Sequence, residues 1–205
     1  MDCIELSIKS LDEKCQDFAK QIQLVYQPDL VIYVARGSYL IGKSVVKVFK
    51  VPLIAVGAQR KGNELKELVA PFLSLFPRWL CNLLRRCELK SNIHGVQVER
   101  HIEFLDDISL IEIASIKKVL IVDDSVDTGS SMLAVRNLVE SKFPNSEIKT
   151  AVLNVMSQSK DVIKVDYSLY EDAMLRTPMS KDSREYKEFC QLYKEHLMKG
   201  MPKGR

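Results

Sequence analysis

Short runs of apolar, mostly β-branched residues alternate along this chain with longer segments in which apolar residues recur every three or four positions. The first run, LVIYVA at 30–35, has the length and composition of a buried strand, and the segment 39–50 after it has helical spacing. This alternation predicts an α/β fold with an open, mainly parallel twisted sheet and helices on both of its faces. The other predicted strands are 52–58, 117–124, 147–156 and, more weakly marked, 165–171, and another helix is predicted over 129–143.

The amino-terminal part predicts a further helix. Ser10 and Glu13 have the spacing of a capping box, in which each side chain bonds to the backbone N–H of the other residue. Apolar residues then recur at helical spacing to near Tyr26, and Pro28 ends the helix.

Two regions interrupt the alternation. Residues 60–112 are too long for a simple connection between strands and predict a partly helical insertion, or hood. The segment 171–205 is polar and ends in MKGMPKGR, which we expect to be a frayed basic tail. A length of 205 residues fits one domain, 1–205, that carries both additions.

Composition narrows the class of protein. The formal net charge is only +3 and no helix-turn-helix is readable, so we expect no nucleic-acid partner. Five scattered cysteines without zinc-binding spacing are typical of reduced thiols in a cytoplasmic protein. The first residues, MDCIELSIKSLDEK, lack the pattern of a signal peptide.

The stretch VLIVDDSVDTGSSM at 119–132 carries the strongest functional signal. It places two carboxylates, Asp123 and Asp124, at the end of a predicted strand, and a small polar turn follows before a predicted helix. Backbone N–H groups in such a turn, together with the helix dipole, form a cradle of phosphate size. Because carboxylates would repel a bare phosphate, the ligand should also carry hydroxyl groups or a metal, as a sugar phosphate with Mg²⁺ does. Gly129 permits the tight backbone, and hydroxyl donors come from Thr128, Ser130 and Ser131.

This stretch resembles the 5-phosphoribosyl 1-pyrophosphate (PRPP) signature of type I phosphoribosyltransferases, with four hydrophobic residues, two acidic residues and a D-T-G-x-[ST]-like loop. The resemblance implies that Asp123 and Asp124 contact the ribose hydroxyls, one of them assisting Mg²⁺, and that Asp127 to Ser131 wrap the 5-phosphate. It also implies PRPP as co-substrate, with pyrophosphate leaving through a transition state of oxocarbenium character. In the family, catalysis depends largely on positioning and electrostatic stabilisation.

A second stretch, IYVARGSYLIG at 32–42, resembles the pyrophosphate loop that follows the first strand of this family. The resemblance assigns Arg36, Gly37 and Ser38 to pyrophosphate binding, and it counts Arg36 among the catalytic residues with the three aspartates. The guanidinium of Arg36 offers forked N–H donors to a phosphate, and Gly37 lets the backbone come close.

The sequence indicates the acceptor of the phosphoribosyl group less clearly than it indicates PRPP. The sequence looks nearest to the 6-oxopurine enzymes, above all the xanthine-guanine type, which share DDxVDTG. In that subgroup the aspartate corresponding to Asp127 is the favoured general base, whereas the alternative role is a loop residue bonded to its own turn. Met156 stands where the subgroup has a lysine, and Lys160, four residues later, either substitutes for it or is simply solvated.

The late hood segment also departs from that subgroup. It lacks the expected tryptophan or phenylalanine for stacking on a base, although Tyr170 could serve instead. Purine salvage is therefore the second acceptor hypothesis from sequence. The residues that stand in the corresponding stretch are Met174, Leu175 and Pro178.

The segment 67–90 favours a different acceptor. From Trp79 onward its apolar residues share one helical face and basic residues take much of the remainder, while Pro71 and Pro77 exclude a membrane-spanning helix. Such an element packs on its own domain or on a dimer partner, or lies at a membrane surface. The membrane alternative suits a lipid-linked glycan acceptor in the synthesis of ribofuranose-containing polysaccharides, which is the leading acceptor hypothesis from sequence. The protein would then be cytoplasmic and peripheral at the inner membrane face.

Residues 91–107 have alternating character and predict a hairpin that folds over the site. Arg100 or His101 would then reach the pyrophosphate, although each also fits an ordinary exposed hairpin position. An enzyme is favoured over a non-catalytic regulator that binds PRPP or a nucleotide, because Arg36 and Asp127 accompany the aspartate pair. A homodimer is expected from the family resemblance.

Overall fold

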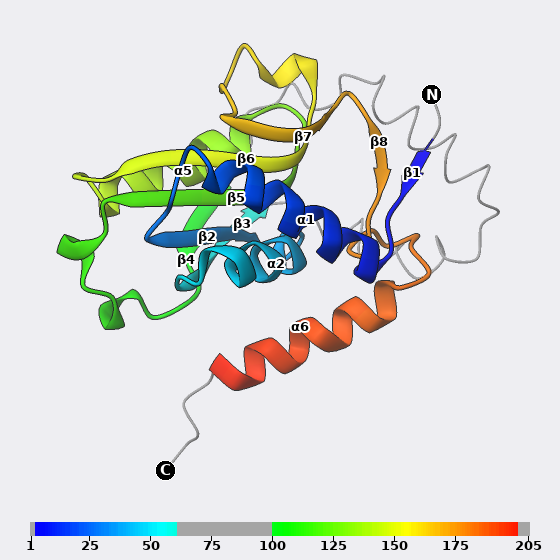
Figure 1. The fold of residues 1–205 in the computed structure, drawn as a ribbon, viewed down its shortest axis with the longest axis horizontal. Coiled ribbons are helices and arrows are strands. Elements are labelled where there is room, and N and C mark those ends of the chain that lie inside the picture. The colour runs from blue at the N-terminus through cyan, green and yellow to red at the C-terminus, as the bar shows by residue number, and fades with distance from the viewer. Residues whose placement is uncertain (1–2, 61–99, 201–205) are drawn as a thin grey trace.

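The computed structural model describes residues 3–60 and 100–200. Its centre is a six-stranded sheet with the order β4-β3-β2-β5-β6-β7 (Figure 1). Strand β4 runs antiparallel to β3, and every other pairing in this sheet is parallel. The predicted α/β class with a mainly parallel sheet is therefore confirmed. The strands are β2 (Leu30–Ala35), β3 (Leu53–Arg60), β4 (Arg100–Phe104), β5 (Lys118–Val126), β6 (Glu147–Val155) and β7 (Tyr167–Glu171).

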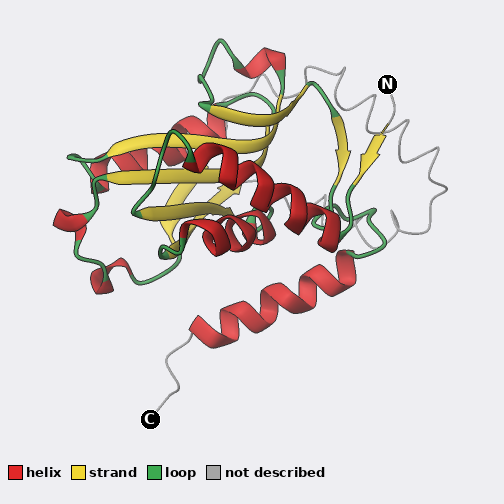
Figure 2. Ribbon diagram, viewed as in Figure 1, coloured by secondary structure: helices red, strands yellow, loops and turns green. Residues whose placement is uncertain are grey.

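Helices cover both faces of the sheet, as Figure 2 shows. Helices α1 (Ile8–Gln23) and α2 (Tyr39–Phe49) lie on one face, and α5 (Ser130–Lys142) lies on the other. Successive side chains of a strand point to opposite faces, so Tyr33 of β2 packs with α1 and α2 while Ile32 packs with α5. Burial on both faces explains why the central strands are continuous apolar runs. Among the described residues, the loops contain the 3-10 helices η1 (Ile108–Leu110), η2 (Ile113–Ser115) and η3 (Ser157–Ser159).

The first helix begins three residues earlier than the sequence pattern predicts. Ser7 is the N-cap, and its hydroxyl accepts a hydrogen bond from the N–H of Ser10 at 3.1 Å. The hydroxyl of Ser10 in turn accepts from the N–H of Ser7 at 2.9 Å. A serine hydroxyl thus takes the part that a glutamate usually plays in a capping box, so the predicted pairing of Ser10 with Glu13 is wrong.

The polar segment after residue 171 forms regular elements; of the expected frayed tail MKGMPKGR, residues 198–200 are helical and 201–205 lie outside the described residues. Strand β8 (Met174–Arg176) pairs in parallel with β1 (Cys3–Glu5), and α6 (Tyr186–Gly200) follows. Phe189 and Tyr193 of α6 are buried in the same core as α1 and α2, so apolar packing holds the helix in place. Figure 1 shows the β1–β8 pair near the start of α6, apart from the main sheet. We call β1 together with residues 172–185 the hood, and residues 60–112 the insertion.

The long insertion is described only at its ends. Of the predicted hairpin at 91–107, residues 91–99 lie outside the described residues, and 100–104 form β4, which pairs with β3 in antiparallel register from Val56↔Phe104 to Arg60↔Arg100. The amphipathic segment 67–90 lies outside the described residues. Across the described part of the chain, no helix has the length and apolar character needed to span a membrane.

Candidate active site

The two functional motifs lie at the carboxyl ends of adjacent central strands. β2 pairs directly with β5, with Tyr33 opposite Val122. β3, which follows β2 in the chain, lies on one side of the β2–β5 pair, and β6, which follows β5, lies on the other side. The two loops therefore diverge at this point, which is where open parallel sheets bind ligands. The sequence motifs 36–38 and 123–131 are brought together here.

The acidic pair belongs to β5 itself and not to a loop after it. Asp123 is only 7% exposed, and its Oδ1 accepts the N–H of Asp124 at 2.9 Å. The Oδ1 of Asp124 accepts the N–H of Ser125 at 2.8 Å. Each carboxylate is thus oriented by the backbone of the next residue.

Burial disfavours the charged form of both carboxyl groups. Burial, and then the charge of Asp124, raise the pKa of Asp123 well above its ordinary value. Burial also raises the pKa of Asp124, and the hydrogen bond from the Ser125 N–H opposes that shift. The pair therefore concentrates negative charge at a point where a ligand with hydroxyl donors or a cation would relieve it.

A small polar pocket follows the acidic pair. It has an empty volume of about 280 Å³ and opens among the residues of the turn before α5. The hydroxyl of Ser125 donates to Oδ1 of Asp127 at 2.8 Å, which fixes the Asp127 carboxylate beside the turn. The hydroxyls of Thr128 and Ser130 lie 3.4 Å apart. The pocket is lined by Asp123, Ser125, Val126, Asp127, Thr128, Gly129, Ser131 and Met132.

Gly129 closes this turn in a conformation that suits only glycine. Its φ is +82°, in the left-handed region, and the helix begins at the next residue. A Cβ at this position would lie 2.9 Å from Cγ2 of Ile163 and 3.2 Å from the carbonyl oxygen of Ser159. The phosphate-type loop is therefore packed directly against the segment that follows β6.

The loop after β2 contacts the acidic pair. A Cβ on Gly37 would lie 2.9 Å from Oδ2 of Asp124, so only glycine lets this backbone approach the carboxylate so closely. The peptide bond between Ala35 and Arg36 is cis. Ser38 is fully buried, and its hydroxyl donates to the carbonyl of Val34. The Ser38 side chain is thus committed to the core, which the sequence pattern did not indicate.

The side chain of Arg36 reaches the C-terminal helix. Its Nη2 donates to Sγ of Cys190 at 2.8 Å and to the hydroxyl of Tyr186 at 3.4 Å. Its guanidinium also lies over aromatic rings of α6. Sequence reasoning missed these partners, and the signal that would have found them is the aromatic spacing at 186, 189 and 193.

The acceptor side is built where β6 ends below the hood. Asn154 is buried, and its side chain bonds both backbone groups of Ala173, donating to the carbonyl at 2.9 Å and accepting the N–H at 3.1 Å. Asp172 accepts hydrogen bonds from the backbone N–H and the hydroxyl of Ser157. Both bridges fix the hood at the carboxyl ends of β6 and β7.

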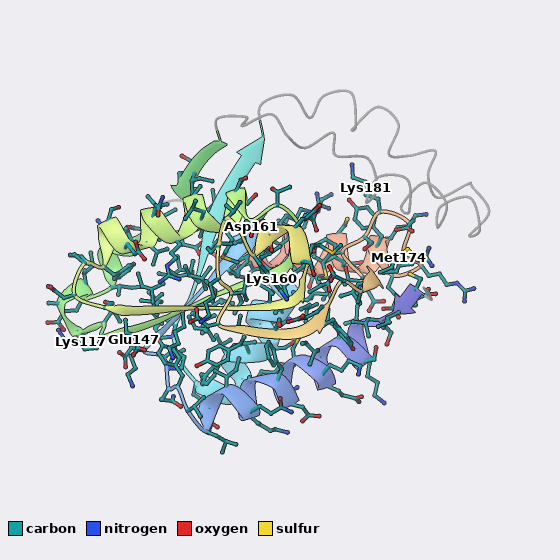
Figure 3. All side chains as sticks on the ribbon, turned by 90° about the horizontal axis from the view of Figure 1, so that it is seen from above. Lys117, Glu147, Lys160, Asp161, Met174 and Lys181 are labelled. Atoms are coloured by element: carbon teal, nitrogen blue, oxygen red, sulfur yellow. The ribbon has the colours of Figure 1, made fainter. Side chains whose placement is uncertain are left out.

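The residues considered for base recognition are placed as follows. Met156 is half-buried just after β6, and Lys160 is exposed with its Nζ 3.0 Å from the carboxylate of Glu171. Figure 3 shows Lys160 beside Asp161, away from Lys117 and Glu147, which mark the amino-terminal ends of β5 and β6. In the hood, Met174 and Pro178 are buried and Leu175 is half-buried, whereas Tyr170 belongs to β7 and is half-buried.

Two further residues predicted for the site, Arg100 and His101, come from the end of the insertion. They belong to β4, and their backbones pair with those of Arg60 and Gln59 in β3. Among residues 3–60 and 100–200, no group of three or more histidine, cysteine or carboxylate side chains could hold a metal ion. The described protein groups would thus supply only part of a metal's coordination shell.

Comparisons with known proteins agree with this arrangement. A model of the phosphoribosyl transferase domain matches residues 7–173. No curated protein sequence matches the chain at a significant level. The fold is similar to that of a purine phosphoribosyltransferase from Pyrococcus horikoshii, with a TM-score of 0.55 and 19% identity, over 87% of this chain and 93% of that one.

Two further solved structures have similar folds. A xanthine-guanine-hypoxanthine phosphoribosyltransferase from Helicobacter pylori has a TM-score of 0.62 and 17% identity, over 91% of this chain and 99% of that one. A hypothetical protein from Neisseria gonorrhoeae with bound ppGpp has a TM-score of 0.53 and 15% identity, over 96% and 99% of the two chains. These TM-scores show a similar fold, and the domain match confirms the resemblance seen in the sequence. The chain therefore belongs to the phosphoribosyl transferase domain family, whose class of activity is phosphoribosyl transfer.

Proposed function

We propose that this protein transfers the 5-phosphoribosyl group of PRPP to a ring nitrogen of a purine base and releases pyrophosphate. The observation that carries the proposal is the close approach of Gly37 to the carboxylate of Asp124, because it brings together the two motifs, 36–38 and 123–131, that this reaction requires. The polar pocket before α5 would hold the 5-phosphate, and the acidic pair would bind the ribose hydroxyls.

The chemistry follows from these positions. The bond from the anomeric carbon to the pyrophosphate oxygen breaks, the leaving group keeps the electron pair, and the acceptor nitrogen bonds to that carbon. Asp127 accepts the proton of the acceptor nitrogen, because its carboxylate is fixed by Ser125 at the edge of the pocket. Most of the rate enhancement would come from holding both substrates in line.

Mg²⁺ fits the donor set as a partner of PRPP. Asp123 and Asp124 offer the oxygen donors that this ion prefers. Burial raises the pKa of both carboxyl groups, and a bound cation would oppose that shift by favouring their charged form. The remaining ligands would come from the pyrophosphate and hydroxyl oxygens of PRPP. When bound, the ion supplies charge neutralisation for the leaving group.

A purine is preferred over a lipid-linked glycan as acceptor. Two proteins of similar fold are a purine and a xanthine-guanine-hypoxanthine phosphoribosyltransferase, and the carboxylate of Asp127, held by the Ser125 hydroxyl, would suit deprotonation of a nitrogen acceptor. The argument for a glycan depended on segment 67–90, which lies outside the described residues. Met156 supplies no donor for an exocyclic purine oxygen, so the order of preference among purine bases is left to experiment.

The test is pyrophosphate release from PRPP and Mg²⁺, with hypoxanthine, guanine, xanthine and adenine offered separately beside a lipid-linked glycan extract. Turnover with a purine, lost on Asp127→Asn, supports the proposal. Turnover with the glycan extract alone would replace the purine by a glycan. Tight PRPP binding without turnover on any acceptor would instead indicate a non-catalytic regulator.

A further inference from the structure

Helix α6 presents an aromatic wall to the pyrophosphate loop. The guanidinium carbon of Arg36 lies 5.5 Å from the ring centroid of Phe189 and 5.8 Å from those of Tyr186 and Tyr193. These distances are in the range of cation–π attraction. Phe189 is only 1% exposed and Tyr193 only 9%, so both rings are held by the core while the arginine is exposed.

Helix α6 engages one of the three nitrogen atoms of this guanidinium by hydrogen bonds. Its Nη2 donates to the thiol of Cys190 and the phenol of Tyr186, which are neutral acceptors, and a thiol accepts weakly. Within the described part of the chain, no hydrogen bond is made by Nε or Nη1 of Arg36. A phosphate oxygen forms a charge-assisted bond with a guanidinium N–H, so Nε and Nη1 can bind pyrophosphate while Nη2 keeps its bonds to α6.

The aromatic wall is fixed relative to the sheet. Glu185, just before α6, accepts the N–H of Ile8 at the start of α1 at 2.5 Å. In the hood, the buried Arg176 pairs with Asp182 at 2.9 Å. The start of α6 is thus tied to two other elements, and its rings define where the guanidinium of Arg36 lies.

We infer that Tyr186 and Cys190 are positioning residues that hold the guanidinium of Arg36 for the pyrophosphate group of PRPP. This inference rests on the proposed phosphoribosyl transfer. It extends the leaving-group site to a C-terminal helix that lies beyond the matched domain, which ends at residue 173.

The first test compares three variants in α6 by PRPP affinity and by steady-state kinetics. Tyr186→Leu removes a ring from the wall, and we expect the Kd and the KM for PRPP to rise about three- to tenfold. Tyr186→Phe keeps the ring and should stay within about twofold of wild type. Gln191→Ala is the matched control, because Gln191 is exposed and bonds only Glu195 of the same helix. The KM for the acceptor should not change in any of them.

The second test is a double-mutant cycle with Arg36→Ala. If Tyr186 acts through the arginine, Tyr186→Leu should add less than about a twofold change in PRPP affinity once Arg36 is absent. Cys190→Ala provides a smaller side-chain change, with an expected two- to fivefold loss of affinity that likewise disappears without Arg36. Circular dichroism confirms that each variant is folded before its affinity is compared.

The outcomes separate the inference from the proposed function. Wild-type affinity for PRPP in folded Tyr186→Leu and Cys190→Ala overturns the inference and leaves phosphoribosyl transfer intact. Equal losses with and without Arg36 overturn it as well, because the helix would then act on the fold alone. If the wild-type protein neither binds PRPP nor releases pyrophosphate, the proposed function and the inference both fail.

Discussion

Replacing Gly129 by alanine should destabilise the protein strongly, because two independent costs fall on this position. The left-handed φ of +82° costs a residue with a Cβ about 1 to 2 kcal/mol. The Cβ would also stand 2.9 Å from Ile163 and 3.0 Å from Val162, and such overpacking costs about 1 to 3 kcal/mol. Together these costs lower the free energy of unfolding by roughly 2 to 5 kcal/mol.

Thermal unfolding followed by circular dichroism measures this loss. For a chain of this length, the lower bound corresponds to a fall in Tm of at least about 4 °C. Gly37→Ala is the matched control, because its φ is not positive and its nearest neighbour is the carboxylate of Asp124. We expect that control to lose less than about 1 kcal/mol of stability but to weaken PRPP binding. A loss below 1 kcal/mol in Gly129→Ala, or equal losses in both variants, would refute the reasoning.

Three further predictions concern the site and its support. Asp123→Asn should abolish PRPP binding yet raise Tm at pH 8, since each unit of raised pKa in the folded carboxyl costs about 1.4 kcal/mol once the group is ionised. Asp127→Asn should lower kcat by about 10²- to 10⁴-fold and leave the Kd for PRPP nearly unchanged, as measured by calorimetry and pyrophosphate release. Asn154→Ala leaves both backbone groups of Ala173 without their side-chain partner, so we expect a loss of about 1 to 3 kcal/mol in chemical denaturation and a higher KM for the acceptor.

The pH dependence of Asp123 has a definite sign. Its folded pKa is raised, so between the unfolded and folded pKa values the folded state binds more protons than the unfolded state. Stability therefore falls as pH rises through that window, and the advantage of Asp123→Asn should shrink from pH 8 toward pH 5. If the difference in Tm between Asp123→Asn and the wild type instead grew on acidification, the assignment of buried, mutually repelling carboxyl groups would be contradicted.

The parts of the fold that sequence predicts are those set by local pattern. β2 and β5 are buried on both faces, so their continuous apolar runs identify them without knowledge of their partners. The acidic pair and Gly129 are readable for a similar reason, because a strand, a turn and a helix follow one another within fourteen residues. Their spacing alone locates a ligand at the carboxyl end of a strand.

The parts that sequence does not predict depend on distant partners. Tyr186 and Cys190 stand among many charged residues, and their partner Arg36 lies 150 and 154 positions away. Ser38 is buried because its hydroxyl donates to the carbonyl of Val34, and the apolar run at 30–35 gives no sign of this bond. Similarly, β1 exists only because β8 pairs with it. Long-range contacts of this kind leave no regular spacing in the chain.

The pairing of β2 with β5 has a consequence for how the protein folds. Roughly 85 residues of chain run between the two loops of the site, from Gly37 to Asp123. Closing a flexible loop of that length costs on the order of 4 kcal/mol in chain entropy. A ligand that contacts both loops binds only after this closure, so it stabilises the folded state by an amount that grows with its concentration relative to Kd. By this linkage, PRPP at a hundred times its Kd would stabilise the folded protein by about 2.7 kcal/mol.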